Sequence, residues 1–366
     1  MKLTTFAAGL AGMMSLSGGA SALARNGRGG KSAPEGASVR PPVHVRHEWD
    51  ALRECVVGRG EDIVNPGWSA ECEFLPPKER ELKTRGAGRP FAETDPESAR
   101  KIVEQVETLA RTLAKLGVTV HRNRSFTPEE REYLRFLQEG SVAIFTRDPM
   151  LTIGNNVIET SLRAPFRRKE RFILRPALSE ALAGRVANHV SMPQAAPSKA
   201  ALDPGNPNDP GPYLEGADVL LDGEDVYAGL SGKASDRAGV KWLARFLGPD
   251  YRVHAIRLKP GFLHLDGVLS LPGPDLAVIC PGAFLDPLPA RVAARRKIPV
   301  TSEEALRFGA NGLILDERRV IWGAEHGRII KALRDHGREV MALPCDEVSR
   351  MGGGFRRTHH PLWREG

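Results

Sequence analysis

Four short segments place ionisable side chains or glycines where apolar runs end. Their chemistry-bearing members are Arg147-Asp148, Glu215 with Asp218, His264 with Asp266, and Gly352-Gly353-Gly354. A carboxylate beside an imidazole suits general acid–base catalysis, and consecutive glycines suit an active-site turn or an anion cradle. Each segment, taken alone, also has a plain structural explanation.

Arg147-Asp148 follows the apolar run Val142–Phe145, which we expect to be a strand, and it precedes Pro149. It is either part of a site at a strand end or an Asp-Pro turn with a surface ion pair. Glu215 and Asp218 flank two small residues, which let backbone and ligand approach closely. The alternative for this pair is a loop with solvated acids.

His264 and Asp266 follow Leu263, and strand alternation predicts that they share one face. A carboxylate on that face would raise the basicity of the imidazole. The same pattern, with no further support, is a weak indicator of catalysis. The three glycines are either a turn that contacts a ligand or a flexible C-terminal tail.

The clearest element expected to support these segments is a helix from Asp95 to Gly117. Asp95 suits the cap, Pro96 the first turn, and Gly117 the end. One apolar face is predicted from the three- and four-residue spacing of Ile102, Val106, Leu109, Leu113 and Leu116. A second helix is expected from Ser235 to Leu247 and a third near Gly327–His336.

Short apolar runs predict most of the strands, and we expect irregular loops over 61–93 and 192–212, which are rich in Pro and Gly. The expected strands are 54–58, 118–120, 142–145, 157–160, 218–221, 253–256, 268–271, 276–279, 313–315, 320–322 and 340–343. Strands in pairs, each set accompanied by a helix, favour repeated ββαβ units over a singly alternating α/β sheet.

In this order, the segments resemble the amidinotransferase and arginine-deiminase superfamily, and most of all the glycine amidinotransferases. The resemblance runs over some 320 residues and rests on His47-Glu48-Trp49-Asp50, Val57-Gly58-Arg59, Arg147-Asp148, Gly154-Asn155, Asp250–His254, His264-Leu265-Asp266, Leu315-Asp316-Glu317 and the terminal glycines. It implies an α/β pentein: five ββαβ modules forming a five-bladed propeller around a pseudo-fivefold axis, with the site at its centre.

The resemblance also implies the chemistry. In that family a cysteine thiolate attacks the guanidinium carbon of arginine, ornithine leaves, and an amine or water takes the amidino group. Carried over, His264 is the general acid–base, and Asp148 and Glu215 hold the guanidinium or orient the histidine. Asp266 is a further guanidinium ligand. The remaining implied substrate-binding residues are Arg147, Gly353, Gly354 and Asn311.

The nucleophile is where this sequence departs from the family. The family's terminus reads Gly-Gly-Gly-Phe-His-Cys, and here Arg357 stands at the position of the cysteine. Arginine stays protonated at physiological pH, so it cannot attack a carbon centre. The implied carboxylates are expected to clamp the Arg357 guanidinium instead, as an internal mimic of the substrate. None of Cys55, Cys72, Cys280 and Cys345 is an obvious substitute.

Three interpretations therefore stay open: an amidinotransferase inactivated by one changed codon, a pseudoenzyme for binding or assembly, and an arginine deiminase-type hydrolase, also inactive as written. Glycine is not the expected amidino acceptor either. The serine-rich segment that helps the animal enzymes to recognise glycine aligns near Glu303-Glu304-Ala305 in this sequence. The expected ligand is a small guanidine such as arginine, no metal or organic cofactor is implied, and relatives suggest a homodimer.

Composition limits the other classes of function. A hydrophobic content of 41% with 27% charged residues is typical of a globular protein. Residues 1–43 carry +4 of the net charge of +7, so the rest of the chain has no basic stripe that would bind nucleic acid. No apolar run is long enough to span a bilayer.

The N-terminus predicts export, and the alternatives are a disordered Gly/Ala/Ser extension or an upstream start codon that is not used. Residues 1–24 resemble a signal peptide that ends in Ala22-Leu23-Ala24, and 25–43 read as a disordered linker before a single domain over 44–366. The location is exported or periplasmic if that segment is a signal, and otherwise cytoplasmic.

Overall fold

The computed structural model describes residues 41–67, 75, 77–133, 140–195 and 211–366. The interpretations of 1–24 and of 25–40 lie outside these residues, as does most of the loop expected over 192–212. Residues Arg40–Gly366 form one compact unit. Val43 is fully buried in it and the Pro41 carbonyl accepts a hydrogen bond from Arg185, so the packed chain starts before His44.

The described residues form five three-stranded sheets. One sheet joins the last strand to the first two, in the order β15-β1-β2 (His359–Glu365, Ala51–Val57, Thr119–Arg122). Each of the others takes three strands that are consecutive in the chain. They are β3-β4-β5 (Met150–Ile153, Asn156–Glu159, Asn188–Ser191), β6-β7-β8 (Val219–Asp222, Asp225–Leu230, Arg252–Arg257), β9-β10-β11 (Leu269–Ser270, Leu276–Ile279, Arg296–Pro299) and β12-β13-β14 (Leu313–Ile314, Arg319–Gly323, Glu339–Leu343).

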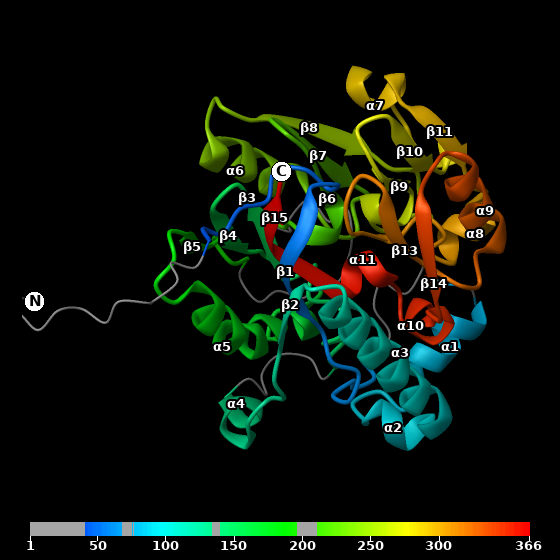
Figure 1. The fold of residues 1–366 in the computed structure, drawn as a ribbon. Coiled ribbons are helices and arrows are strands. Elements are labelled where there is room, and N and C mark those ends of the chain that lie inside the picture. The colour runs from blue at the N-terminus through cyan, green and yellow to red at the C-terminus, as the bar shows by residue number, and fades with distance from the viewer. Residues whose placement is uncertain (1–40, 68–74, 76, 134–139, 196–210) are drawn as a thin grey trace, which may run out of the picture. The chain divides into compact units, whose positions relative to one another are not determined.

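The five sheets share one topology. In each, the central strand is antiparallel to one neighbour and parallel to the other. The parallel connection passes through helix α3, α5, α6, α7 or α9 (Pro96–Lys115, Glu170–Leu182, Arg237–Leu247, Ala290–Ala294, Gly327–Asp335). The predicted ββαβ repeat is therefore confirmed. The strand β15, from the C-terminal end, lies beside β1 and completes the first sheet (Figure 1).

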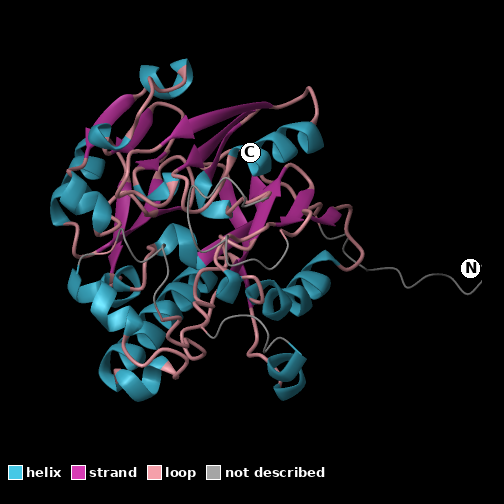
Figure 2. Cartoon of the chain, turned by 180° about the vertical axis from the view of Figure 1, so that it is seen from behind, coloured by secondary structure: helices cyan, strands magenta, loops and turns pink. Residues whose placement is uncertain are grey.

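Smaller helices complete the described chain. They are α1 (Pro77–Thr84), α2 (Phe91–Thr94), α4 (Pro128–Tyr133), α8 (Ser302–Leu306), α10 (Asp346–Arg350) and α11 (Phe355–Thr358), with short 3-10 turns over Pro165–Arg167, Gly216–Asp218, Leu265–Gly267 and Pro281–Ala283. Seen from behind, the helices lie mostly toward the periphery, with strands between them (Figure 2). None of the helices in the described ranges is both long and apolar enough to cross a bilayer.

Apolar clusters join each sheet to the next. Val56 of β1 packs with Met150 of β3 and Val157 of β4. Ile158 of β4 packs with Val226 of β7. A larger cluster joins the third, fourth and fifth sheets through Tyr227, Val278, Ile298, Ile314 and Trp322, and the fifth sheet returns to the first through Val57, Leu313 and Ile321. The shared cores thus run through all five sheets in order and close on the first.

The structure confirms the long predicted helix and corrects two strands. Asp95 accepts the Ser98 amide and Pro96 opens the helix. The apolar run Val142–Phe145 is a buried turn and not a strand, because the Phe145 amide donates back to the Val142 carbonyl at 3.1 Å. His264 and Asp266 do not lie in a strand either, since Leu265–Gly267 is a 3-10 turn. The expected loop over 61–93 contains α1 and α2.

Candidate active site

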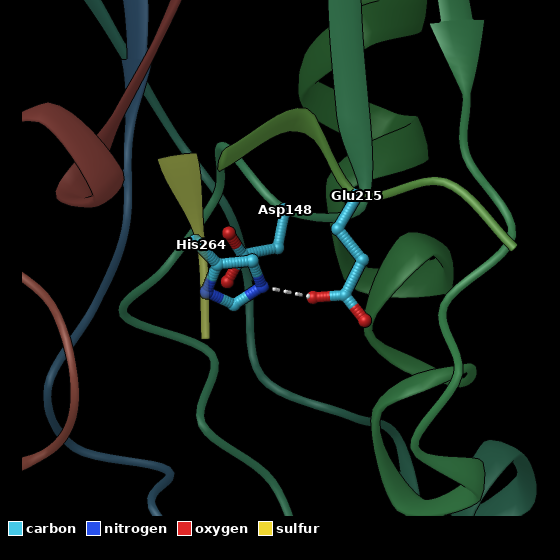
Figure 3. A group of neighbouring side chains, drawn as sticks. All are labelled: Asp148, Glu215 and His264. Atoms are coloured by element: carbon cyan, nitrogen blue, oxygen red, sulfur yellow. Dashed lines mark hydrogen bonds and ion pairs between the residues drawn. The ribbon is translucent and has the colours of Figure 1, made fainter. Parts of the chain in front are cut away.

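The candidate residues occupy equivalent places in the five sheets. Each lies in the segment that leads into the first strand of its sheet: Asp148 before β3, Glu215 before β6, His264 before β9, Asn311 before β12 and Arg357 before β15. Asp148, Glu215 and His264 each present one polar atom within 4.8 Å of the other two (Figure 3). The repeated topology therefore brings together residues that are far apart in the sequence.

His264 is held by Glu215. Its Nε2 lies 2.7 Å from Glu215 Oε2, with the imidazole 2% and the carboxylate 0% exposed. Burial, the largest influence, and the Arg357 charge both oppose protonation of His264. Asp218 and the hydrogen bond to Glu215 outweigh them, so the pKa of His264 is raised above its ordinary value. The residue paired with the histidine is therefore Glu215, and not Asp266 as strand alternation had suggested.

A third carboxylate fixes the geometry of this pair. Asp218 accepts hydrogen bonds from the Ser235 hydroxyl at 2.7 Å and from the Leu265 amide at 2.9 Å. The Ser235 hydroxyl in turn accepts the Glu215 amide at 3.0 Å. Asp218 thus connects the backbones that carry Glu215 and His264, and burial raises its pKa to about 6.

Arg357 joins the cluster through Asp148. Its Nε lies 3.1 Å from Asp148 Oδ1 and its Nη2 lies 2.5 Å from Oδ2, so that one carboxylate grips the guanidinium with both oxygens. Its Nη1 donates to the Gly352 carbonyl. The guanidinium carbon also lies 4.8 Å from the centre of the Phe145 ring, within cation–π range. Arg357 and Asp148 are 3% and 0% exposed.

Asp148 has a second cationic partner that sequence analysis missed. Arg167 Nη1 lies 2.7 Å from Asp148 Oδ2, and Arg167 also pairs with Glu170 at 2.9 Å. Burial, the largest influence, would raise the pKa of Asp148, but the charges of Arg357 and Arg167 hold it well below its usual range. No pattern around Arg167-Arg168 indicated that Arg167 would bind Asp148, which lies 19 residues earlier in the chain.

The glycines and Asn311 shape the backbone around Arg357. Asn311 Oδ1 accepts the amides of Gly354 at 3.0 Å and of Arg357 at 3.3 Å. A Cβ on Gly353 would lie 2.7 Å from the Phe145 ring, and one on Gly354 would lie 2.7 Å from the Asn311 carbonyl. Only glycine fits at these two positions, so the segment is a packed turn rather than a flexible tail.

Asp266 contacts a different arginine from the one expected. Its Oδ2 lies 3.0 Å from Nη1 of Arg356, whose remaining nitrogens bind Glu48 at 2.9 and 3.0 Å. Arg147 lies against the backbone of the same segment, with Nε 3.5 Å from the Arg356 carbonyl. Asp266 and Arg147 therefore support the turn before β15. The part played by Glu48 was not foreseen, although Glu48 lies within one of the resemblance motifs.

The buried Glu48–Arg356 pair makes a pH-dependent contribution to stability. Burial alone would raise the pKa of Glu48, but Arg356 and Arg147 lower it from 4.5 to about 2. A depressed carboxyl pKa stabilises the fold above the unfolded value and loses that effect as the pH falls toward the folded value. The contribution is about 3 kcal/mol at neutral pH.

We therefore expect the stability difference between wild type and Glu48→Gln to shrink by about 2 kcal/mol between about pH 6 and about pH 3. Urea unfolding at several pH values measures it. Glu104→Gln is the control, since Glu104 is 65% exposed in its ion pair with Arg100. A pH-independent difference for Glu48→Gln would contradict this assignment.

The described cysteines are not placed to act as nucleophiles. Cys55, Cys280 and Cys345 are buried and free, and Cys72 lies outside the described residues. Burial raises the pKa of Cys55 to about 12 and raises that of Cys345 still further above its ordinary range. Cys55 lies in β1 and Cys345 precedes α10, so neither is in a segment that leads into the cluster.

The cluster favours ion pairing over metal binding. Asp148, Glu215 and His264 are close enough to share an ion. Asp148, however, already binds two guanidinium groups, and Glu215 binds the imidazole. What the arrangement offers chemically is a carboxylate that grips a planar cation beside a histidine that exchanges protons.

Comparison with known proteins agrees with this chemistry. The profile of the family described as "N,N dimethylarginine dimethylhydrolase, eukaryotic" matches residues 89–359. The mitochondrial glycine amidinotransferase of Danio rerio is 24% identical, over 89% of this chain and 83% of that protein. The L-arginine:L-lysine amidinotransferase of Pseudomonas savastanoi pv. phaseolicola is 27% identical, over 89% and 95%.

Solved structures share the fold. The amidinotransferase SxtG of Microseira wollei superimposes with a TM-score of 0.73 at 24% identity, covering 89% of this chain and 98% of that one. A dimethylarginine dimethylaminohydrolase from Pseudomonas aeruginosa, in complex with citrulline, gives a TM-score of 0.57 at 18% identity, covering 85% and 99%. The chain therefore belongs to the family of amidinotransferases and dimethylarginine hydrolases that modify guanidino groups.

Proposed function

We propose that this chain is an amidinotransferase-like protein that does not transfer amidino groups. The reason is that Arg357 occupies both the position of the nucleophile and the place of a substrate guanidinium. Asp148 and the Glu215–His264 pair have the composition that guanidine chemistry needs. The carbon of a guanidinium is attacked by a nucleophile while a histidine protonates the departing amine. Arg357 supplies a permanent cation instead of a nucleophile.

The observation that carries the proposal is the two-point contact between Arg357 and Asp148, at 3.1 and 2.5 Å, with both side chains buried. A bidentate carboxylate is the usual partner of a bound guanidinium. An arginine ligand would have to displace Arg357 from Asp148, and Arg357 is tethered to the chain at high effective concentration.

The arrangement of the sheets supports the architecture. We infer that the five sheets are the blades of a pentein propeller, because their apolar cores are shared in chain order and close on the first sheet. In such a ring the segments that lead into the first strands converge near one axis. This accounts for the meeting of Asp148, Glu215, His264, Asn311 and Arg357.

A guanidine hydrolase is the second candidate for the ancestral reaction. The family profile that matches this chain is that of a hydrolase, whereas the two relatives named above are amidinotransferases. Both reactions need the same carboxylate and histidine, so the products of a reactivated variant separate the two candidates.

Calorimetry tests whether Arg357 blocks the ligand. We expect wild type to bind neither arginine nor ornithine, and Arg357→Ser to bind arginine, because the serine leaves Asp148 open to a guanidinium. Arg350→Ser is the matched control, since Arg350 lies in α10 and pairs with Glu347, and it should behave as wild type. Equal binding of arginine by wild type and Arg357→Ser would refute the proposal.

A further inference from the structure

Asp218 is a fully buried carboxylate beside the candidate site, at the end of the 3-10 turn Gly216–Asp218. Its partners among the described residues are hydrogen-bond donors without charge. The Ser235 hydroxyl and amide donate to Oδ2 at 2.7 and 3.3 Å, and the Leu265 amide donates to Oδ1 at 2.9 Å. Three neutral donors favour the ionised form of a carboxylate, but they do not balance its charge.

The fold holds this carboxylate against the backbone of the site. A Cβ on Gly229 of β7 would lie 2.5 Å from Asp218 Oδ1 and 2.8 Å from the Leu265 Cβ, so only glycine fits there. Oδ1 binds the amide of the residue that follows His264, and Oδ2 binds the hydroxyl that accepts the Glu215 amide. Asp218 is therefore fixed next to the backbone at both ends of the Glu215–His264 hydrogen bond.

The charged groups around His264 act in opposite directions. Burial, the largest influence, and the Arg357 charge lower the pKa of His264, whereas Asp218 and Glu215 raise it. The charge of Asp218 has a larger influence than the hydrogen bond to Glu215. Asp148 also lies close to the imidazole, but two arginines take up its charge. The small pocket that His264 lines is otherwise formed by uncharged residues.

We infer that Asp218 is a positioning residue that stabilises the protonated form of His264, in which the imidazole carries the proton that a departing amine needs. All of its hydrogen bonds go to the protein, so it acts on His264 through its charge and not by contact with a ligand. The inference rests on the proposed function, because His264 is the proton donor of the reaction that Arg357 prevents. In the protein as it stands, Asp218 offsets the effect of the Arg357 cation on the imidazole.

Nitrogen NMR of the full chain with 15N-labelled histidine tests this role, and the signal missing from His264→Gln assigns His264. The pH midpoint at which the His264 ring titrates is expected to fall by about one pH unit in Asp218→Asn, the effect of losing one nearby opposite charge. Ser235→Ala keeps the carboxylate but removes the donor at 2.7 Å, which makes Asp218 easier to protonate. It should lower the His264 midpoint by a smaller amount, and it decides the test alone if Asp218→Asn does not fold.

Asp236→Asn is the matched control and should leave the His264 midpoint unchanged. Asp236 follows Ser235 in the chain, but its carboxylate accepts the amides of Gly239 at 2.7 Å and Tyr213 at 3.1 Å instead. A purely structural role for Asp218 would lower the thermal unfolding midpoint without moving the titration of His264. The inference is overturned if neither Asp218→Asn nor Ser235→Ala lowers the His264 midpoint, or if Asp236→Asn lowers it as much as Asp218→Asn.

This experiment uses no ligand, so its result is separate from that of the proposed function. Arginine can fail to bind to Arg357→Ser while the titration of His264 still depends on Asp218. The reverse result, arginine binding to Arg357→Ser with a His264 midpoint that does not respond to Asp218, would overturn only the role of Asp218.

Discussion

Arg357→Cys is expected to gain reaction with arginine, at a rate at least about 10³-fold above that of wild type. The substitution removes the cation from Asp148 and introduces a thiol at the position that Asn311 and the glycine turn hold in place. The new thiol gives its proton to His264 and its sulfur forms a bond to the guanidinium carbon, the bond from that carbon to the ornithine nitrogen breaks, and His264 passes the proton to the departing amine. Loss of a nucleophile typically removes nearly all covalent catalysis, so its return has a large effect.

Chromatography of the products measures this gain and distinguishes the two reactions. Ornithine release indicates an amidinotransferase, because the amidino group stays on the enzyme until an amine accepts it. Citrulline and ammonia indicate a hydrolase. Arg357→Ser is the control without a thiol and should be inactive. A guanidine-mimicking electrophile should label Arg357→Cys only, and failure to label it would show that the site has decayed beyond one residue.

Asp148→Asn is expected to lower the free energy of unfolding by about 3–5 kcal/mol. Asp148 is fully buried and compensates two guanidinium groups, Arg167 at 2.7 Å and Arg357 at 2.5 Å. Removing its charge leaves Arg357 without an anionic partner and Arg167 with Glu170 alone. A buried cation that loses its partner pays a desolvation penalty that nothing offsets.

Arg357→Met is the matched comparison and should cost only about 1–2 kcal/mol. The methionine replaces the aliphatic stem of the arginine, and Asp148 keeps its ion pair with Arg167. Urea unfolding of the two variants at neutral pH gives both values. If Asp148→Asn costs no more than Arg357→Met, the carboxylate does not hold the two arginines in the way described.

Local signals predicted the elements that depend on local chemistry. Asp95, Pro96 and the apolar repeat of α3 specify a helix within one stretch of chain. The strand β15 was missed, because His359, His360 and Pro361 lack the apolar alternation of a strand. It forms at the edge of its sheet, where proline is tolerated, and it buries both histidines against β1.

The site required information that no single segment carries. Asp148, Glu215, His264 and Arg357 meet because five sheets repeat one topology, and the order of the motifs indicated this only through the family resemblance. Pairing His264 with Asp266 failed because the chain turns into a 3-10 helix after His264, which places the two side chains on different partners. The clamp on Arg357 was expected, whereas the second partner of Asp148, Arg167, depends on a contact that only the folded chain reveals.

The mass of the intact protein after incubation with arginine tests most directly whether Arg357 has replaced a nucleophile. Arg357→Cys should gain the mass of one amidino group, lost on adding an amine acceptor or on hydrolysis, while wild type should keep its unmodified mass. An amidino adduct on the wild-type protein would show that another residue carries the chemistry, and the account of Arg357 would then be wrong.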